Sequence, residues 1–248
     1  YFYSKDGNIN DFNSLNNIFK ISRYAFIQNI QNIPTIEDFI DNPLLVSKYW
    51  IAAQESLSRQ INNNLFIKTH DFMGNINNNI FTNEKMTKCF IYVVRDPRSV
   101  AVSYSHHMQK TIDETINFMT NKNYIILYKK EDKTLPEILS SWNIHYNSWK
   151  QFLSKGNGIL IKYEDLITNP KNTFILILNF LRRHINFDIN ENKVNKTIDV
   201  TSFKNLQKLE NEKGFSESPN IKNKFFRKGI TNEWKDCLTK EQLNKIEK

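Results

Sequence analysis

A basic and hydroxyl-bearing segment follows the apolar run at residues 89–94, which breaks directly into Arg95-Asp96-Pro97. A short run of β-branched and aromatic residues that ends in turn-forming residues indicates a buried strand. Asp96 can cap a following helix, and Pro97 suits its first position. Further polar groups then recur at helical spacing: Ser99, Ser103 and His106 or His107. A guanidinium at a strand end beside a helix start is a suitable arrangement for binding a phosphate.

A second chemically capable pair, Lys68 and His70, follows the apolar run 65–67. On an extended segment both side chains point to the same side, so an ammonium group lies beside a titratable imidazole. Such a pair can deprotonate a hydroxyl and neutralise a leaving phosphate. The tripeptide by itself leaves another interpretation open, in which His70 is a hydrogen-bonded structural histidine.

A basic loop near the C-terminal end, at residues 226–235, is a third candidate for phosphate binding. Arg227 and Lys228 supply positive charge, and Gly229 lets the backbone approach a phosphate closely. Asn232 follows, and asparagine tolerates a left-handed backbone better than other non-glycine residues. A solvated basic loop is the alternative interpretation.

Strands and helices alternate along the chain, which predicts an α/β fold with a parallel sheet covered on both faces. The expected strands are 65–67, 89–94 and 159–163. Ligands bind beyond the carboxyl ends of strands in such sheets. Polar residues follow each expected strand, at 68–70, 95–96 and 163–165, so we expect the site at these strand ends.

Capping and proline signals predict the helix starts. Thr35 with Asp38 marks one start, and Asn42-Pro43 marks another that leads into residues 44–60. The pattern Thr134-x-x-Glu137 predicts a capping box ahead of an apolar helical stripe that ends near Gly156. Asn169-Pro170 predicts a further helix start.

The composition suits a protein that binds an anionic ligand. The 248 residues carry a formal net charge of +8, although lysines are scattered along the chain and favour solvated faces over a nucleic-acid-binding stripe. The two cysteines, Cys89 and Cys237, are far apart and form no metal-ligand pattern, which indicates a reducing compartment. We expect no metal site, and no apolar run reaches the ~18 residues that a membrane span needs.

The segment 92–104, with Arg95 and Ser103 eight residues apart, resembles the 3′-phosphate-binding segment of the cytosolic-type sulfotransferases. These enzymes use 3′-phosphoadenosine 5′-phosphosulfate (PAPS), and the matching arginine and serine hold its 3′-phosphate. Lys68-Thr69-His70 is similar to the family's Lys-Thr-His motif, whose histidine is the general base. With this resemblance, a catalytic His70 becomes the preferred interpretation.

Three further segments resemble the family. The loop with Arg227, Lys228 and Gly229 is similar to its Arg-Lys-Gly-x-x-Gly-Asp-Trp-Lys loop, with Asn232 and Glu233 in place of the second glycine and the aspartate. The remaining matches concern the adenine: Thr201 would touch the base edge, Phe203 would stack on the ring, and Tyr163 would lie near it. A helix cap followed by a core aromatic residue explains Thr201 and Phe203 equally well in isolation.

The resemblance implies a P-loop-like, three-layer α/β fold with a central parallel sheet flanked by helices. It also implies a cytoplasmic enzyme that transfers a sulfuryl group from PAPS to a hydroxyl or amine of a small-molecule or carbohydrate acceptor. His70 would take the proton, Lys68 would offset charge on the leaving phosphate, and adenosine 3′,5′-bisphosphate (PAP) would be the product.

One departure from the family concerns the phosphosulfate. The family's first phosphate loop, Pro-Lys-Ser-Gly followed shortly by Thr-Trp, is not in this sequence. We therefore expect residues 1–248 to be a single sulfotransferase domain truncated at its N-terminus, which transfers sulfate poorly by itself. A non-catalytic PAP-binding module and a basic nucleic-acid-binding protein are the alternatives, and the oligomeric state stays open.

Overall fold

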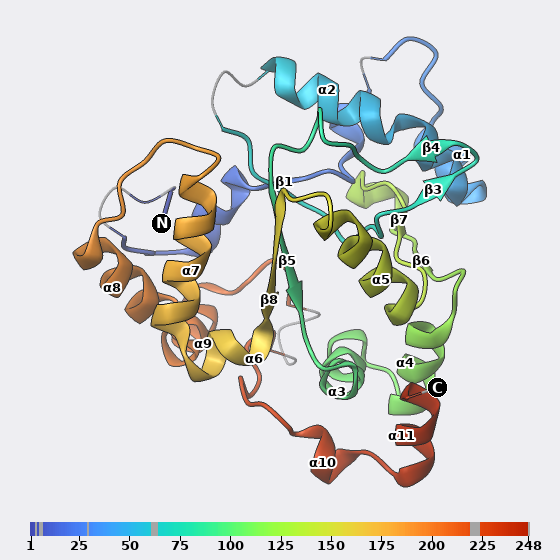
Figure 1. Cartoon of the computed structure of the whole chain (residues 1–248). Coiled ribbons are helices and arrows are strands. Elements are labelled where there is room, and N and C mark those ends of the chain that lie inside the picture. The colour runs from blue at the N-terminus through green and yellow to red at the C-terminus, as the bar shows by residue number, and fades with distance from the viewer. Residues whose placement is uncertain (3, 5–6, 29, 61–63, 219–223, 248) are drawn as a thin grey trace. The chain divides into compact units, whose positions relative to one another are not determined.

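A computed structural model describes residues 1–2, 4, 7–28, 30–60, 64–218 and 224–247 (Figure 1). The chain divides into two compact units. The first unit comprises Tyr1–Asn17, Ile91–Met119 and Ile159–Lys248, and the second comprises Ile18–Phe90 and Thr120–Gly158. Within the described residues, no helix is long and apolar enough to cross a membrane.

The first unit is built mainly of helices around one strand pair. Its elements are η1 (Phe12–Asn17), β5 (Phe90–Val94), α3 (Pro97–Met108), α4 (Ile112–Thr120), β8 (Gly158–Lys162), α6 (Tyr163–Thr168), α7 (Pro170–Arg182), α8 (Glu191–Val200), α9 (Phe203–Lys213), α10 (Trp234–Cys237) and α11 (Lys240–Ile246). Buried apolar residues from several of these elements form its core: Ala101, Val102, Ile116, Ile161, Leu178, Leu181 and Val194.

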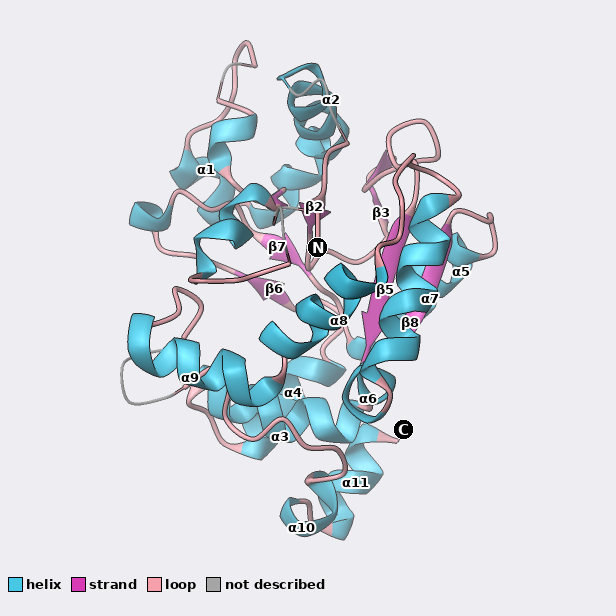
Figure 2. Ribbon diagram, turned by 90° about the vertical axis from the view of Figure 1, so that its left-hand side faces the viewer, coloured by secondary structure: helices cyan, strands magenta, loops and turns pink. Residues whose placement is uncertain are grey.

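Strands β5 and β8 pair with each other and lie side by side (Figure 1 and Figure 2). At one end the Phe90 N–H donates to the Asn157 carbonyl at 2.9 Å. At the other end the Asp96 N–H donates to Glu164 Oε1 at 3.1 Å. Because like ends of the strands are adjacent, the pair is parallel, and its carboxyl end carries the residues that begin α3 and α6.

Helix α3 starts as the sequence predicts. The Asp96 carboxylate accepts the Arg98 N–H at 2.9 Å, and Pro97 is the first helical residue. The same carboxylate also receives the Arg98 guanidinium, which holds the pKa of Asp96 below its usual value although burial opposes this. The strand end and the helix start around Arg95 are therefore well defined.

The second unit holds the remaining short strands. Its elements are β1 (Phe19–Lys20), η2 (Tyr24–Phe26), α1 (Ile36–Asp41), η3 (Pro43–Tyr49), α2 (Trp50–Gln60), β2 (Ile67–Lys68), β3 (Asn75–Ile76), β4 (Asn79–Ile80), β6 (Ile125–Ile126), η4 (Lys130–Asp132), β7 (Glu137–Ile138) and α5 (Trp142–Leu153). Strands β1 and β2 pair in parallel, whereas β3–β4 and β6–β7 are antiparallel. Its core includes aromatic residues that contact one another edge to face: Trp50, Phe81 and Trp149.

Most predicted helix starts are confirmed. Thr35 and Asp38 form a capping box at α1, and Pro170 begins α7. Pro43 begins a 3₁₀ segment that leads into α2. The α/β fold class is also confirmed, since helices are interspersed with strands and the pairs β1–β2 and β5–β8 are parallel.

The predicted capping box of Thr134 and Glu137 is wrong. Glu137 lies in β7, where it pairs with Ile126 of β6. Pro136 disfavours the helical conformation of the residue before it. The backbone groups of Glu137 and Ile138 pair with β6, so they are not available for the hydrogen bonds of a helix. Helix α5 begins instead at Trp142, with the Ser141 hydroxyl as its cap. This correction matters for function, because Glu137 becomes available to the segment that carries His70.

Candidate functional site

Arg95 directly follows β5 and lies against Tyr163, the first residue of α6. Its guanidinium carbon is 4.4 Å from the centre of the Tyr163 ring, and its Nη2 donates to the Ile230 carbonyl at 3.4 Å. Its Nε is buried and has no hydrogen-bond partner in the described part of the chain. An unpaired buried donor is costly, and an anion such as a phosphate is the partner a guanidinium binds best. The residues at this strand end therefore fit a phosphate group.

Helix α9 positions the basic loop that approaches Arg95. Gln207 Nε2 donates to the carbonyls of Phe226 and Arg227 at 2.8 and 3.2 Å. Glu210, which is only 1% exposed, accepts the N–H groups of Phe225 and Phe226 at 2.7 and 3.0 Å. These two side chains lie one turn apart on α9, so one helix face holds the backbone that leads into Arg227.

Gly229 lies in close contact with Phe203, the first residue of α9. Its φ is +62°, and a Cβ at this position would lie 2.2 Å from Cδ2 of Phe203. Both the left-handed conformation and the contact require glycine. Asn232 is also left-handed, with φ +64°, as its tolerance of that conformation predicts. The loop thus brings Gly229, Phe203 and Arg95 into one connected group.

Glu233 pairs with both basic side chains of the loop. Arg227 binds its carboxylate with two N–H donors, one of them at 2.9 Å, and Lys228 Nζ is 2.7 Å from Oε1. The hydrogen bond from Arg227, together with Lys228, lowers the pKa of Glu233 to about 2. The carboxylate is therefore charged at neutral pH and offsets part of the positive charge of this loop.

Two other predicted ligands, Ser103 and Thr201, lie in or next to helices of the first unit. Ser103 is half-buried in the second turn of α3. His106 lies in the last turn of α3, and burial and the charge of Arg227 lower its pKa. This end of α3 is therefore close to the basic loop that contains Arg227. Thr201 is the C-cap residue directly after α8, and its hydroxyl donates to the Thr197 carbonyl at 2.6 Å.

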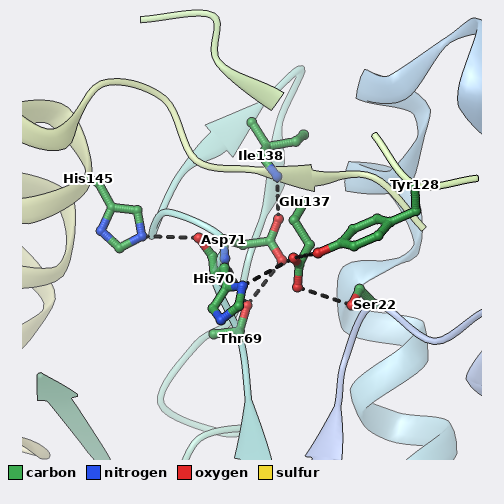
Figure 3. Close-up of polar contacts among 8 residues, drawn as sticks. All are labelled: Ser22, Thr69, His70, Asp71, Tyr128, Glu137, Ile138 and His145. Atoms are coloured by element: carbon green, nitrogen blue, oxygen red, sulfur yellow. Dashed lines mark hydrogen bonds and ion pairs between the residues drawn. The ribbon is translucent and has the colours of Figure 1, made fainter. Parts of the chain in front are cut away.

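In the second unit, His70 contacts a buried carboxylate (Figure 3). Its Nδ1 is 3.3 Å from Oε2 of Glu137; the imidazole is 46% exposed, whereas the Glu137 side chain is 4% exposed. The Tyr128 hydroxyl donates to the same oxygen, and the Ser22 hydroxyl donates to Oε1 at 3.1 Å. Burial alone would raise the pKa of Glu137, but the hydrogen bonds from His70, Tyr128 and Ser22 hold it below its usual value.

Asp71, next to His70, is the second buried carboxyl group of this network. It is 2% exposed, and its Oδ1 accepts the Ile138 N–H at 2.8 Å. The Thr69 hydroxyl donates to its Oδ2 at 3.0 Å. Burial, and then the charge of Glu137, raise the pKa of Asp71 to about 8. Of these two neighbouring carboxyl groups, Asp71 therefore holds a proton more readily, and Glu137 carries the negative charge.

The segment around His70 is held by further contacts from α5. His145 Nε2 is 3.1 Å from the His70 carbonyl oxygen, and Trp149 Nε1 donates to the Asp71 carbonyl at 3.1 Å. Burial lowers the pKa of His145, so its imidazole is neutral at neutral pH. Lys68, two residues before His70, ends β2 and pairs in register with Lys20 of β1. The backbone on both sides of His70 is thus anchored.

Asp71→Asn is expected to change the pH dependence of stability. The folded-state pKa of Asp71, about 8, lies above its ordinary value of 3.8. At a pH between these two values, the folded chain therefore keeps a proton on Asp71 that the unfolded chain releases. The free energy of unfolding therefore falls as pH rises through this window, by up to about 1.4 kcal/mol per pH unit. Asparagine does not titrate, so the variant should match the wild type near pH ~4 and unfold at a higher temperature near pH ~8.

Thermal unfolding measured across this pH range checks the prediction, with the exposed residue Asp41 changed to asparagine as a matched control. Asp41→Asn should keep the wild-type slope. An Asp71→Asn variant with the wild-type pH dependence would show that Asp71 ionises normally in the folded chain.

The chain belongs to the sulfotransferase family, because the family model described as "Sulfotransferase domain" matches residues 9–248. Cytosolic sulfotransferase 5 of Arabidopsis thaliana is 29% identical over 161 residues, which cover 63% of this chain and 49% of that protein. Sulfotransferase 1B1 of Canis lupus familiaris is 28% identical over 162 residues, which cover 63% and 51%. The chain spans about half the length of the curated relatives it matches.

Solved structures show the same fold. Retinol dehydratase in a complex with retinol and PAP has a TM-score of 0.60 at 18% identity, over 94% of this chain and 69% of that one. Mouse sulfotransferase SULT7A1 complexed with PAP has a TM-score of 0.56 at 20% identity, over 79% and 67%. These likenesses confirm the predicted P-loop-like α/β fold.

No sequence signal marks Glu137, Tyr128 and Glu210 as residues that support the site. The pattern Thr134-x-x-Glu137 is typical of a helix cap, and Tyr128 and Glu210 lie in no motif. The available signal for Glu137 was Pro136, which argues against a helix start that includes its neighbour.

Proposed function

We propose that this chain is a sulfotransferase domain that transfers a sulfuryl group from PAPS to a hydroxyl or amine of a small-molecule or carbohydrate acceptor. The observation that carries the proposal is the site around Arg95. There a guanidinium with an unpartnered buried N–H lies against the Tyr163 ring and the loop that contains Gly229. Membership of the sulfotransferase family supports the same reaction.

The proposed nucleotide site uses the residues of the first unit. The 3′-phosphate is held by basic groups, a hydroxyl and a close backbone: Arg95, Ser103, Arg227, Lys228 and Gly229. The adenine is bound by Tyr163, Thr201 and Phe203. The 4.4 Å contact of Arg95 with Tyr163 and the contact of Gly229 with Phe203 support a shared site for base and phosphate.

The proposed chemistry uses Lys68 and His70 of the second unit. His70 accepts the proton of the acceptor hydroxyl while the acceptor oxygen bonds to sulfur and the bond from sulfur to the phosphate oxygen breaks. Lys68 offsets the negative charge that develops on that phosphate oxygen. The partly exposed imidazole, 46% accessible on its side chain, supports this role because an acceptor can reach it.

Titration calorimetry with PAP and with adenosine 5′-phosphate tests the nucleotide site. The second ligand lacks the 3′-phosphate, and each charge-assisted hydrogen bond it loses is worth ~1.5–3 kcal/mol. We expect PAP to bind at least about tenfold more tightly. Equal affinities would contradict the proposal.

Turnover separates the remaining alternatives. Transfer of labelled sulfate from PAPS by the complete protein supports the enzyme. PAP binding without any transfer would support the non-catalytic module. Binding to polynucleotides that weakens steeply with salt would support the nucleic-acid-binding alternative.

We also propose that residues 1–248 act as one sulfotransferase domain in the cytoplasm. The family match over residues 9–248 includes segments of both units, which supports one domain. The name of the Arabidopsis relative, a cytosolic sulfotransferase, supports the location.

A further inference from the structure

The contact between His70 and Glu137 is part of a fully hydrogen-bonded carboxylate site (Figure 3). Figure 3 shows His70 and Tyr128 approaching the Glu137 carboxylate from different sides, with Ser22 at its other oxygen. The carboxylate is almost completely buried, and each of its neighbours here can act as a hydrogen-bond donor. An ionised carboxylate only accepts hydrogen bonds, so the His70 nitrogen that faces it must carry a hydrogen.

We infer that Glu137 is a positioning residue for His70, holding the half-exposed imidazole with its proton on Nδ1 so that Nε2 is the nitrogen that accepts a proton. This inference rests on the proposed function, because it assigns the base nitrogen in the proposed transfer. In neutral imidazole one nitrogen donates and the other accepts, and the hydrogen bond of one sets the state of the other.

The backbone around Glu137 supports this role. Strand β7 is bonded to the segment after His70 in two places. The Phe72 N–H donates to the Ile138 carbonyl at 2.9 Å, and the Ile138 N–H donates to the Asp71 carboxyl group at 2.8 Å. These bonds fix Glu137 beside His70.

The network also explains why the negative charge resides on Glu137. Asp71 meets one backbone N–H and one hydroxyl, and burial raises its pKa. Glu137 receives donors from three residues and stays ionised. Once His70 takes a proton, the adjacent carboxylate stabilises the imidazolium. The other titratable groups around His70 are Lys68, Tyr128 and His145.

Nuclear magnetic resonance of the ring nitrogens tests the inference without any activity measurement. The chain has five histidines, so the His70→Ala spectrum assigns the His70 signals. In the neutral form of the wild-type His70 ring we expect the proton on Nδ1. In Glu137→Gln we expect a mixture of both tautomers, because an amide can donate as well as accept. A proton on Nε2 in the wild type would overturn the inference. The wild-type measurement decides this even if Glu137→Gln fails to fold.

Steady-state kinetics of the complete protein form the second arm. Glu137→Gln should lower kcat by at least about tenfold, because the wrong tautomer of His70 loses part of the ~10²–10⁴-fold contribution of a general base. The affinity for PAP should not change. Glu137→Asp, which keeps the charge, should recover part of the rate.

A double-mutant cycle separates positioning from a general structural effect. In a His70→Ala background, Glu137→Gln should cost no further activity. Additive losses would show that Glu137 acts independently of His70 and would overturn the inference. The matched control is Glu131→Gln, an exposed residue in the same segment, which should keep the wild-type rate. If the complete protein transfers no sulfate, the proposed function fails while the tautomer measurement still decides the role of Glu137.

Discussion

Replacing His70 with alanine is expected to lower kcat for sulfuryl transfer by ~10²–10⁴-fold, the usual contribution of a general base. The dissociation constant of PAP should stay nearly unchanged, because the proposed phosphate ligands Arg95 and Arg227 belong to the other unit of the chain. Steady-state rates and calorimetric titration of the complete protein measure these effects.

His184→Ala is a suitable control for this experiment. That imidazole packs on Phe180 at 5.0 Å between ring centres, after the end of α7, and has no role in the proposed reaction. It should retain the wild-type kcat. If His70→Ala kept the full rate, His70 would be a hydrogen-bonded structural histidine and not the general base. Lost PAP affinity would instead show that the substitution disturbs the fold around β2.

Arg95→Ala should weaken PAP binding by about one to two decades, because it removes a charge-assisted contact worth ~1.5–3 kcal/mol. Arg95 should matter more than Arg227 or Lys228. Those two side chains already pair with Glu233, whereas Arg95 forms no salt bridge with any residue that the structure describes. No carboxylate of the described residues therefore competes with a phosphate for Arg95.

Calorimetric titration of both proteins with PAP measures the loss. Arg182→Ala serves as the control, since it removes the same charge from an exposed position in the last turn of α7. It should bind PAP as the wild type does. Equal PAP affinity of Arg95→Ala and the wild type would show that Arg95 does not bind the 3′-phosphate.

The parts of the fold that the sequence predicted are those set by neighbouring residues. The start of α3 depends on Asp96 and Pro97 alone, and both act on the next few backbone groups. Capping by Thr35 and Asp38 is equally local. The apolar run before Arg95 likewise predicted β5 with an error of one residue.

The carboxylate beside His70 could not be predicted in this way. Glu137 lies 67 positions from His70 and 115 from Ser22, so their contacts depend on the packing of distant segments. The local pattern Thr134-x-x-Glu137 favours a helix cap, but strand pairing and a buried site for the carboxylate outweigh that preference. The roles of the individual site residues remain predictions for the same reason, because they depend on a ligand and not on the chain alone.

The pairing of Glu233 with Arg227 and Lys228 has a consequence for the thermodynamics of ligand capture. Long basic side chains carry about 2 kcal/mol of rotamer entropy each, which is lost when they are immobilised. Glu233 already restrains both side chains in the folded chain, so most of this loss accompanies folding and not association. The basic side chains of the loop are therefore preorganised before a phosphate binds, so binding costs them little further conformational entropy.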